Sequence, residues 1–362
     1  MPPLTRAQRF QSLFPSAPAF RFRQAEAALF QPDATGWGSV SVFPKAMREE
    51  MEAKIPWMSV TLHRMLTSKD GETFKAVLRT EDNLLFETVL MGNAREQWTV
   101  CVSSQVGCAM HCVFCATGAM GLKRSLASDE IVDQLRFWLQ FLHKPLTRSL
   151  PGGERSSGGA HDASRISNIV FMGMGEPLAN YENVKSTLRQ WLACTDIGPN
   201  HITVSTVGLL PFLQKILQDA AWPPVRIAIS LHSADETLRK KIVPTTTGNY
   251  LAELSQWIKK YLQTKASNKR HVTFEYVLLR GVNDSVRDAK LLADFVTTTG
   301  RVKVNLIPFN DINDAALQRS NNTDEFAAVL KKCGVTVTVR QSAGLDIMAA
   351  CGQLANSLYP RP

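Results

Sequence analysis

The 362-residue chain has no apolar run of the roughly 18 residues that a transmembrane helix requires, which argues against a helical membrane protein. Residues 1–5, MPPLT, lack the apolar core of a secretory signal, so we expect no export by that route. No internal repeat is visible, which argues against a solenoid. From these absences we expect a globular cytoplasmic protein without a membrane partner.

Cysteines are few and unevenly spread: the chain has seven, and four of them lie between Cys101 and Cys115. This distribution does not suit a framework of disulfides and is typical of metal or redox chemistry in a reducing cytosol. Hydrophobic residues make up 44% and charged residues 20% of the chain, which are globular values. Lysine and arginine exceed aspartate and glutamate by 41 to 32, and the net charge of +9 suits a polyanionic partner, although many soluble enzymes share it.

Three of these cysteines, Cys108, Cys112 and Cys115, have the spacing C-x3-C-x2-C, which lets one loop present several sulfurs to a metal centre. A tetrahedral zinc site would need a fourth ligand, and His111 inside the loop is poorly placed to supply it. A [4Fe-4S] cluster held by three cysteines keeps one iron open for another ligand. We therefore favour an iron–sulfur cluster, with a zinc site completed by a distant residue, or unligated thiols, as alternatives.

From about residue 97 onward, short β-branched runs alternate with helical stretches, which predicts an α/β fold with a parallel sheet. One helix begins at Ser128, a suitable N-cap, and its apolar face includes Ile131, Leu135 and Trp138. A full or partial barrel is favoured over an open sheet, and both place ligands at the carboxyl ends of the strands. The expected strands are 99–102, 169–172, 202–205, 226–231, 272–278, 302–307 and 335–339.

Residues 1–96 are expected to form a separate small domain with helical stretches and a hairpin of two strands, 74–78 and 84–90. Basic and aromatic side chains on its helices can hold an RNA backbone, or can simply form a solvated face. Segment 145–165 is rich in Gly, Ser, Pro and Arg, and we expect a surface insertion there. The basic residues of the first domain are Arg21, Arg23, Lys45 and Arg48.

Several small or polar residues follow the expected strands, at the edge where a ligand would bind. Gly175 and Glu176 lie in a glycine-rich turn, where a ligand can approach the backbone and the carboxylate can accept a hydrogen bond from an ammonium group. A plain turn is the alternative. The other strand-end groups can bind a ribose and an adenine edge, or can be satisfied loop residues. They are Ser205, the run Ser230-Leu231-His232, and Asn310.

One further cysteine, Cys351, lies among small residues in the stretch 344–354, which we expect to be a loop. Taken alone, it would be a buried inert thiol, since free cysteines are often buried. Cys194 and Cys333 match no motif, and we interpret both as structural.

The cysteine motif, with the aromatic Phe114 before its third cysteine, resembles the signature of the radical S-adenosylmethionine (SAM) enzymes. Together with the stretches 101–105, 172–177, 230–232 and 349–354, it resembles the RlmN/Cfr family. Members of that family are radical SAM methyltransferases that act on an adenosine of large-subunit ribosomal RNA. The resemblance covers nearly the whole chain.

This resemblance implies a partial (β/α) barrel with a small, mainly helical N-terminal domain. We accordingly expect an accessory domain over 1–96, a radical SAM core over 97–343 and a tail over 344–362 that carries the methyl-bearing cysteine. It also implies that Gly175 and Glu176 contact SAM, and that the cofactors are a [4Fe-4S] cluster and SAM.

The family's mechanism uses two SAM molecules per turnover, because the amidine carbon of adenine has no electron pair with which to attack a methyl group. By similarity, Cys351 takes a methyl group from one SAM, and the cluster cleaves the second. The radical formed at methylated Cys351 then adds to the adenine, and Glu87 removes the ring proton. Cys101 finally attacks Cys351 and releases the product, leaving a transient disulfide.

The target implied by the resemblance is an adenosine of 23S rRNA. RlmN-type enzymes methylate C2, which we favour, and Cfr-type enzymes methylate C8; Met348 occupies a position that is usually acidic in the family, and the run 340–343 is also atypical. A tRNA anticodon-loop adenosine is a further candidate substrate. We expect a monomer served by a small electron-donor protein such as flavodoxin or ferredoxin. The alternative from another class is a zinc-stabilised RNA-binding module without catalysis.

Overall fold

The computed structural model describes residues 3–31, 33–93, 97–143, 165–264 and 272–355, so all but one residue of the expected insertion at 145–165 lies outside the described part. The strands are β1 (Val60–Thr67), β2 (Thr73–Thr80), β3 (Leu85–Gly92), β4 (Trp98–Cys101), β5 (Gln105–Gly107), β6 (Leu122–Ser125), β7 (Ile166–Phe171), β8 (Ile202–Thr206), β9 (Arg226–Ser230), β10 (Val272–Leu278), β11 (Val302–Pro308) and β12 (Thr336–Val339). The helices are α1 (Arg6–Leu13), α2 (Ala19–Ala28), α3 (Lys45–Lys54), α4 (Ala116–Met120), α5 (Ser128–His143), α6 (Tyr181–Cys194), α7 (Leu210–Gln218), α8 (Glu236–Ile242), α9 (Tyr250–Thr264), α10 (Val286–Thr299) and α11 (Thr323–Lys332).

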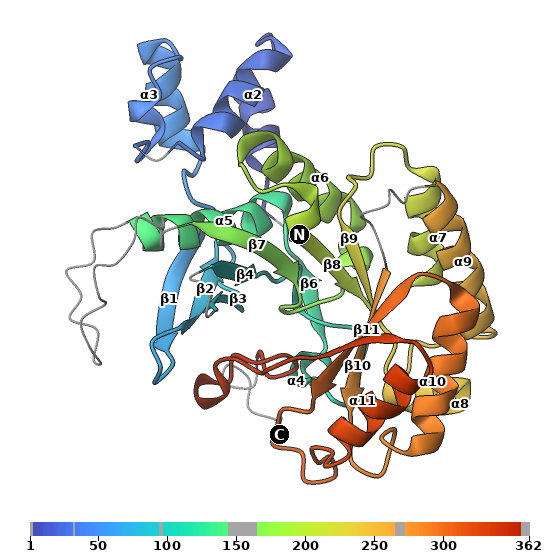
Figure 1. The fold of residues 1–362 in the computed structure, drawn as a ribbon. Helices are drawn as coiled ribbons and strands as arrows, with labels where there is room; N and C mark the ends of the chain where they lie inside the picture. Colours follow the sequence, from blue (N-terminus) through green and yellow to red (C-terminus); the bar gives the residue numbers. More distant parts are fainter. Residues whose placement is uncertain (1–2, 32, 94–96, 144–164, 265–271, 356–362) are drawn as a thin grey trace, which may run out of the picture.

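Ten strands form one sheet in the order β1-β2-β3-β4-β7-β8-β9-β10-β11-β12. Pairing is antiparallel from β1 to β4 and parallel from β4 to β12. Helices α6, α7, α9, α10 and α11 lie on the outside of the curved parallel part (Figure 1). The order leaves β1 and β12 as edges, which confirms the predicted partial barrel, and each strand expected after residue 97 is present.

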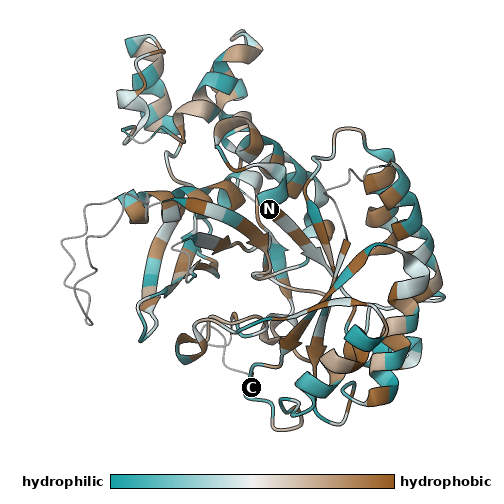
Figure 2. Ribbon diagram, in the orientation of Figure 1, coloured by the Kyte–Doolittle hydropathy of each residue, from teal (hydrophilic) through white to brown (hydrophobic). Residues whose placement is uncertain are grey.

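Apolar residues recur in these elements at the positions that face the core. In α5, the predicted Ile131, Leu135 and Trp138 have no solvent exposure. Figure 2 shows hydrophobic residues concentrated in the strands at the middle of the sheet. Within the described residues, none of the helices is long and apolar enough to cross a bilayer.

The two largest apolar clusters of the described residues lie in different parts of the molecule. The N-terminal core joins α1, α2 and α3 around Trp37, whose indole Nε1 donates to the Ile55 carbonyl at 2.8 Å. The main core includes residues of β2 and β3, the expected hairpin, together with β1, which precedes them. The large sheet therefore contains strands that the sequence suggests for the N-terminal unit, and the helical unit above it in Figure 1 is smaller than residues 1–96.

A buried cluster of charges joins the N-terminal segment to α5. The Asp133 carboxylate has no exposure and is hydrogen-bonded by the guanidinium groups of Arg6 and Arg136. It also accepts from the Ser59 backbone N–H at 2.6 Å and the Ser59 hydroxyl at 2.7 Å. Burial alone would raise the pKa of Asp133, but the two arginines outweigh it and the pKa lies below its usual value.

We predict that Asp133→Asn lowers the free energy of unfolding by about 3–5 kcal/mol at pH 7, because two arginines are left buried with less compensation. The Asp133 contribution is fully present above the unfolded pKa of about 3.9 and is lost as pH falls through the lower folded pKa. Urea unfolding between pH 3 and pH 7 measures both effects. The difference between wild type and variant should shrink below about pH 4.

The matched control for this prediction is Asp196→Asn. Asp196 pairs with Arg165 at 2.7 Å, but both side chains are mostly exposed, so the change should cost less than about 1 kcal/mol. Equal losses for the two variants would contradict the role given to the buried cluster.

Candidate active site

The C-x3-C-x2-C loop runs between β5 and α4 and brings its three thiols to one cavity of about 140 Å³. Burial raises the pKa of Cys108 to about 12, and it also raises the pKa of Cys112 and Cys115. Such thiols stay protonated at neutral pH unless a metal centre takes up their charge. Among the described residues, no three Cys, His, Asp or Glu side chains are arranged to bind a single metal ion. A [4Fe-4S] cluster does not require that arrangement, because each thiolate binds a separate iron.

Glu176 also lines this cavity. Its carboxylate accepts the backbone N–H of Leu178 at 2.9 Å and of Val207 at 2.8 Å. Burial nevertheless raises the pKa of Glu176 to about 7, so a cation placed beside it would favour the ionised form. Gly175 has φ +97°, and a Cβ there would lie 2.5 Å from Gln105 Cβ, so the turn requires glycine.

Three of the strand-end residues expected at the ligand site line the cavity: Ser205, Ser230 and His232. The His232 ring is buried, which lowers its pKa to about 3, and its Nδ1 accepts the Val277 backbone N–H at 3.0 Å. The neutral ring therefore carries its proton on Nε2. Leu231 is buried outside the cavity lining, and no part of Asn310 lines it either.

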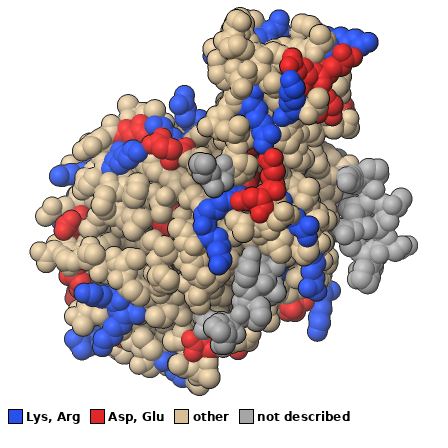
Figure 3. All heavy atoms as spheres, turned by 180° about the vertical axis from the view of Figure 1, so that it is seen from behind, with Lys and Arg blue, Asp and Glu red and all other residues tan. Residues whose placement is uncertain are grey.

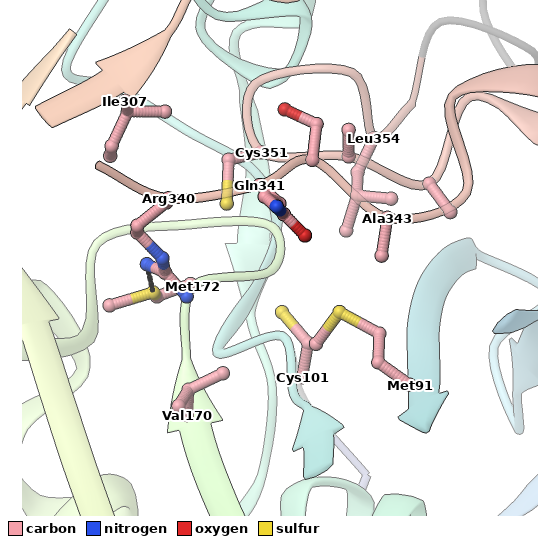
Figure 4. A pocket seen from close by; sticks show the side chains of 13 residues that line it. Met91, Cys101, Val170, Met172, Ile307, Arg340, Gln341, Ala343, Cys351 and Leu354 are labelled. Carbon is pink, nitrogen blue, oxygen red and sulfur yellow. Dashed lines mark hydrogen bonds between the residues drawn. The ribbon is translucent and has the colours of Figure 1, made fainter. Parts of the chain in front are cut away.

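Cys351 lines the same cavity and also borders a second, smaller pocket of about 50 Å³. Cys101, at the end of β4, lies in that second pocket, and Figure 4 shows the sulfur atoms of Cys101, Met91 and Cys351 directed into it. The structure thus brings Cys351 together with the cysteine loop and Cys101, which lie far earlier in the sequence. Three residues line both spaces, Met172, Ile307 and Cys351, and Cys351 is the cysteine among them.

The segment that carries Cys351, residues 344–355, is called the tail segment here. It crosses from β12 to β2 and β3, the strands near the opposite edge of the open sheet (Figure 1). The buried Lys75 Nζ donates to the Met348 carbonyl at 3.0 Å, and the buried Glu87 carboxylate accepts the Ala355 backbone N–H at 2.7 Å. Lys75 and Glu87 form an ion pair of 3.2 Å, and neither side chain has solvent exposure.

Further bonds hold the tail segment against the cluster loop. The Ala116 N–H donates to the Gly352 carbonyl at 2.8 Å, and the Thr117 hydroxyl donates to the Leu354 carbonyl at 2.9 Å. Asn310, expected at the ligand site, instead donates its amide to the Cys351 carbonyl at 3.0 Å. Glu87, expected as a base, lines neither cavity and holds the tail segment.

The sequence did not indicate Lys75, Glu275 or Arg340 as residues of the site. A lysine in a strand and an arginine near a chain end are usually surface groups, and Glu275 lies inside an apolar run. A charged residue in the middle of a buried strand was the one available signal for Glu275.

All seven cysteines of the structure are free thiols. The transient disulfide expected between Cys101 and Cys351 is therefore not present in this structure. Burial and the neighbouring Cys351 raise the pKa of Cys101 to about 12, which disfavours the thiolate needed to form such a bond.

Curated relatives align with nearly the whole chain. A probable dual-specificity RNA methyltransferase RlmN from Synechococcus sp. is 40% identical over 343 residues, covering 93% of this chain and 91% of the relative. A dual-specificity RNA methyltransferase RlmN from Anaeromyxobacter sp. is 38% identical over 360 residues, covering 98% and 89%. The chain belongs to the RlmN family. No family model matches the sequence.

A solved structure of a radical SAM methyltransferase shares the fold of this chain. The crystal structure of a radical SAM methyltransferase from Sphaerobacter thermophilus has a TM-score of 0.82 and 36% identity, and the match covers 97% of this chain and 98% of that one. Membership of the RlmN family confirms the predicted resemblance and fold. It sets aside the alternative of a zinc-stabilised RNA-binding module without catalysis.

We predict that Lys75→Met destabilises the protein by about 3–5 kcal/mol and frees the tail segment, because it leaves the Glu87 charge buried without its partner. Denaturant unfolding measures the first effect, and hydrogen exchange at the Ala355 amide measures the second. The double variant Lys75→Met/Glu87→Leu should recover most of the stability, since two apolar side chains replace the pair, yet keep fast exchange at Ala355.

An exposed helical pair supplies the control. Lys54 and Glu50 lie 3.0 Å apart on α3, and Lys54→Met should change stability by less than about 1 kcal/mol. Slow exchange at Ala355 in Lys75→Met would show that the pair does not hold the tail segment.

Proposed function

We propose that the protein is a radical SAM methyltransferase that adds a methyl group to C2 of an adenosine in 23S rRNA, with Cys351 as the carrier of the methyl carbon. The observation that carries this proposal is the position of Cys351. It borders both the cavity of the cysteine loop and the pocket of Cys101. A thiol that receives a methyl group in the cavity of the cysteine loop and passes it on beside the Cys101 thiol must be accessible from both spaces.

The residues of the larger cavity fit the two expected cofactors. Cys108, Cys112 and Cys115 would hold a [4Fe-4S] cluster, which when bound supplies the electron that cleaves SAM. Glu176, fixed by two backbone N–H groups, would accept the SAM ammonium group, and the hydroxyls of Ser205 and Ser230 would bind the nucleoside part. In keeping with the family's chemistry, two SAM molecules would be used in each turnover.

Release of the product would depend on Cys101 and Glu87. The Cys101 thiolate would attack the Cys351 sulfur, forming the S–S bond while the carbon–sulfur bond to the RNA breaks. The departing electron pair stays on the adenine and is protonated there. Glu87 is covered by the Ala355 amide, so it can act as a base only after the tail segment has moved.

A groove between α2 and α6 is the surface that we propose binds the RNA backbone. It is lined by Arg23 and Arg189 together with Glu26 and Glu182. Figure 3 shows Lys and Arg side chains gathered where the helical unit meets the body, with acidic residues among them. Arg21 and Arg48, by contrast, donate to the carbonyls of Val42 and Gly38 and so support loops.

The remaining partners of the proposed reaction follow from its chemistry. We expect 23S rRNA as the main substrate and a tRNA anticodon-loop adenosine as a second one. Cluster reduction would require an electron donor such as flavodoxin or ferredoxin. The reaction would proceed in the cytoplasm with the protein as a monomer.

Mass spectrometry of adenosines from 23S rRNA tests the function directly. RNA from cells that lack the protein, treated anaerobically with the reconstituted enzyme, SAM and a reduced electron donor such as flavodoxin, should gain 2-methyladenosine. Cys351→Ala should abolish the product, whereas Cys333→Ala, which changes another exposed cysteine, should leave it intact. Appearance of 8-methyladenosine instead would establish Cfr-type specificity and overturn the C2 proposal.

We predict that Cys101→Ala traps a covalent protein–RNA complex, because the intermediate on Cys351 then lacks the thiol that releases it. Denaturing gels with labelled RNA, followed by nuclease digestion and peptide mapping, would locate the adduct on Cys351. The double variant Cys101→Ala/Cys351→Ala should give no complex. A complex that persists in the double variant would place the carrier elsewhere.

A further inference from the structure

The pocket between Cys101 and Cys351 contains a single ionic group among the described residues that line it, the guanidinium of Arg340. Figure 4 shows this side chain extending toward Met172 on the side of the pocket where Cys351 lies. The rest of the lining is apolar, sulfur-containing or neutral. A charge in such surroundings acts more strongly on its neighbours than it would in water.

Arg340 is held in place from three directions. Its backbone N–H donates to the Leu306 carbonyl at 2.9 Å, and its Nη1 lies 3.1 Å from Met172 Sδ. The same Nη1 lies 3.6 Å from the Glu275 carboxylate. Glu275 is 3% exposed and its other oxygen accepts the Asn305 amide at 3.0 Å, so the acid is itself fixed.

Cys101 depends on this cation more than an exposed thiol would. The titratable and charged groups that face its sulfur are Cys351 and Arg340. Burial, followed by Cys351, raises the pKa of Cys101; a hydrogen bond from the Met172 backbone and, after it, the charge of Arg340 oppose both effects. The strands on either side of β4 contribute Met91 and Val170 to the pocket, Met172 follows directly after β7, and none of these side chains ionises.

We propose that Arg340, fixed by Glu275, is a positioning residue that acts through Cys101 by stabilising its thiolate in the pocket shared with Cys351. The inference rests on the proposed function, in which the Cys101 thiolate is the group that releases the product. Arg340 touches neither SAM nor RNA in this role. It sets the fraction of Cys101 that is present as thiolate and can attack the Cys351 sulfur.

The test measures Cys101 directly and does not require methyl transfer. The full chain with its cluster reconstituted, carrying Cys351→Ala so that Cys101 is the one thiol of the pocket, is treated anaerobically with iodoacetamide at pH 8. Peptide mass spectrometry follows the alkylation of Cys101 relative to Cys333, an exposed cysteine that serves as an internal reference. Arg340→Gln and Arg340→Lys are compared in this background.

Each unit by which the pKa of Cys101 rises should slow its alkylation about threefold, since tenfold fewer thiolates are partly offset by their greater nucleophilicity. We expect this slowing in Arg340→Gln and its recovery in Arg340→Lys, which keeps the charge. A purely structural role predicts the opposite sign, because the shorter side chain would open the pocket and speed alkylation. Unchanged or faster alkylation in Arg340→Gln would therefore overturn the proposal.

Glu275→Gln provides a second measurement should Arg340→Gln fold poorly. The substituted amide keeps an oxygen that can hold Arg340 in place but removes the negative charge that partly neutralises it, so Cys101 should react faster, and a slower reaction would count against the proposal. Failure of the proposed function would appear differently, as absence of methyladenosine with these alkylation rates intact.

Discussion

The arrangement of the site depends on one buried ion pair. Lys75 and Glu87 lie on neighbouring strands without solvent exposure, and burying two charges is tolerated only when their remaining hydrogen-bonding capacity is used. Part of that capacity goes to the backbone of the tail segment, at Met348 and Ala355. The tail segment helps to satisfy the pair, and the pair in return fixes the segment that carries Cys351. If the tail segment were a helix or strand, its backbone N–H and C=O groups would be hydrogen-bonded within that element or sheet and could not bond to Lys75 and Glu87.

The open barrel explains why the distant Cys351 meets the cysteines of the stretch 101–115. Parallel strands bring their carboxyl ends to one edge, where the cysteine loop and the Glu176 turn form a cavity. The tail segment then crosses the side that the sheet leaves open and adds Cys351 to that edge. Cys101 reaches the same place from β4, the strand where the antiparallel and parallel parts of the sheet join.

Much of this could be predicted from the sequence. The strand positions follow from β-branched runs, and the cavity cysteines with Glu176 follow from motifs on single loops. β1 was missed because residues 61–64 are exposed and carry no apolar alternation. The Lys75–Glu87 pair was missed because it is a diagonal contact across a hairpin, which depends on the register of β2 and β3. Asn310 was expected at the ligand because it follows a strand, and its amide donates to the Cys351 carbonyl. Sequence alone cannot tell which neighbour such an amide faces.

The two anchors of the tail segment also limit how far its cysteine can travel. Cys351 lies three positions after Met348, and an extended chain spans at most about 3.3–3.6 Å per residue, so this arm reaches roughly 10 Å. While the anchors hold, the thiol cannot swing out to a base that remains stacked in folded RNA. The nucleotide itself would have to leave its stack and enter the barrel, and the energetic cost of that extrusion would favour unpaired, loosely stacked adenosines as targets.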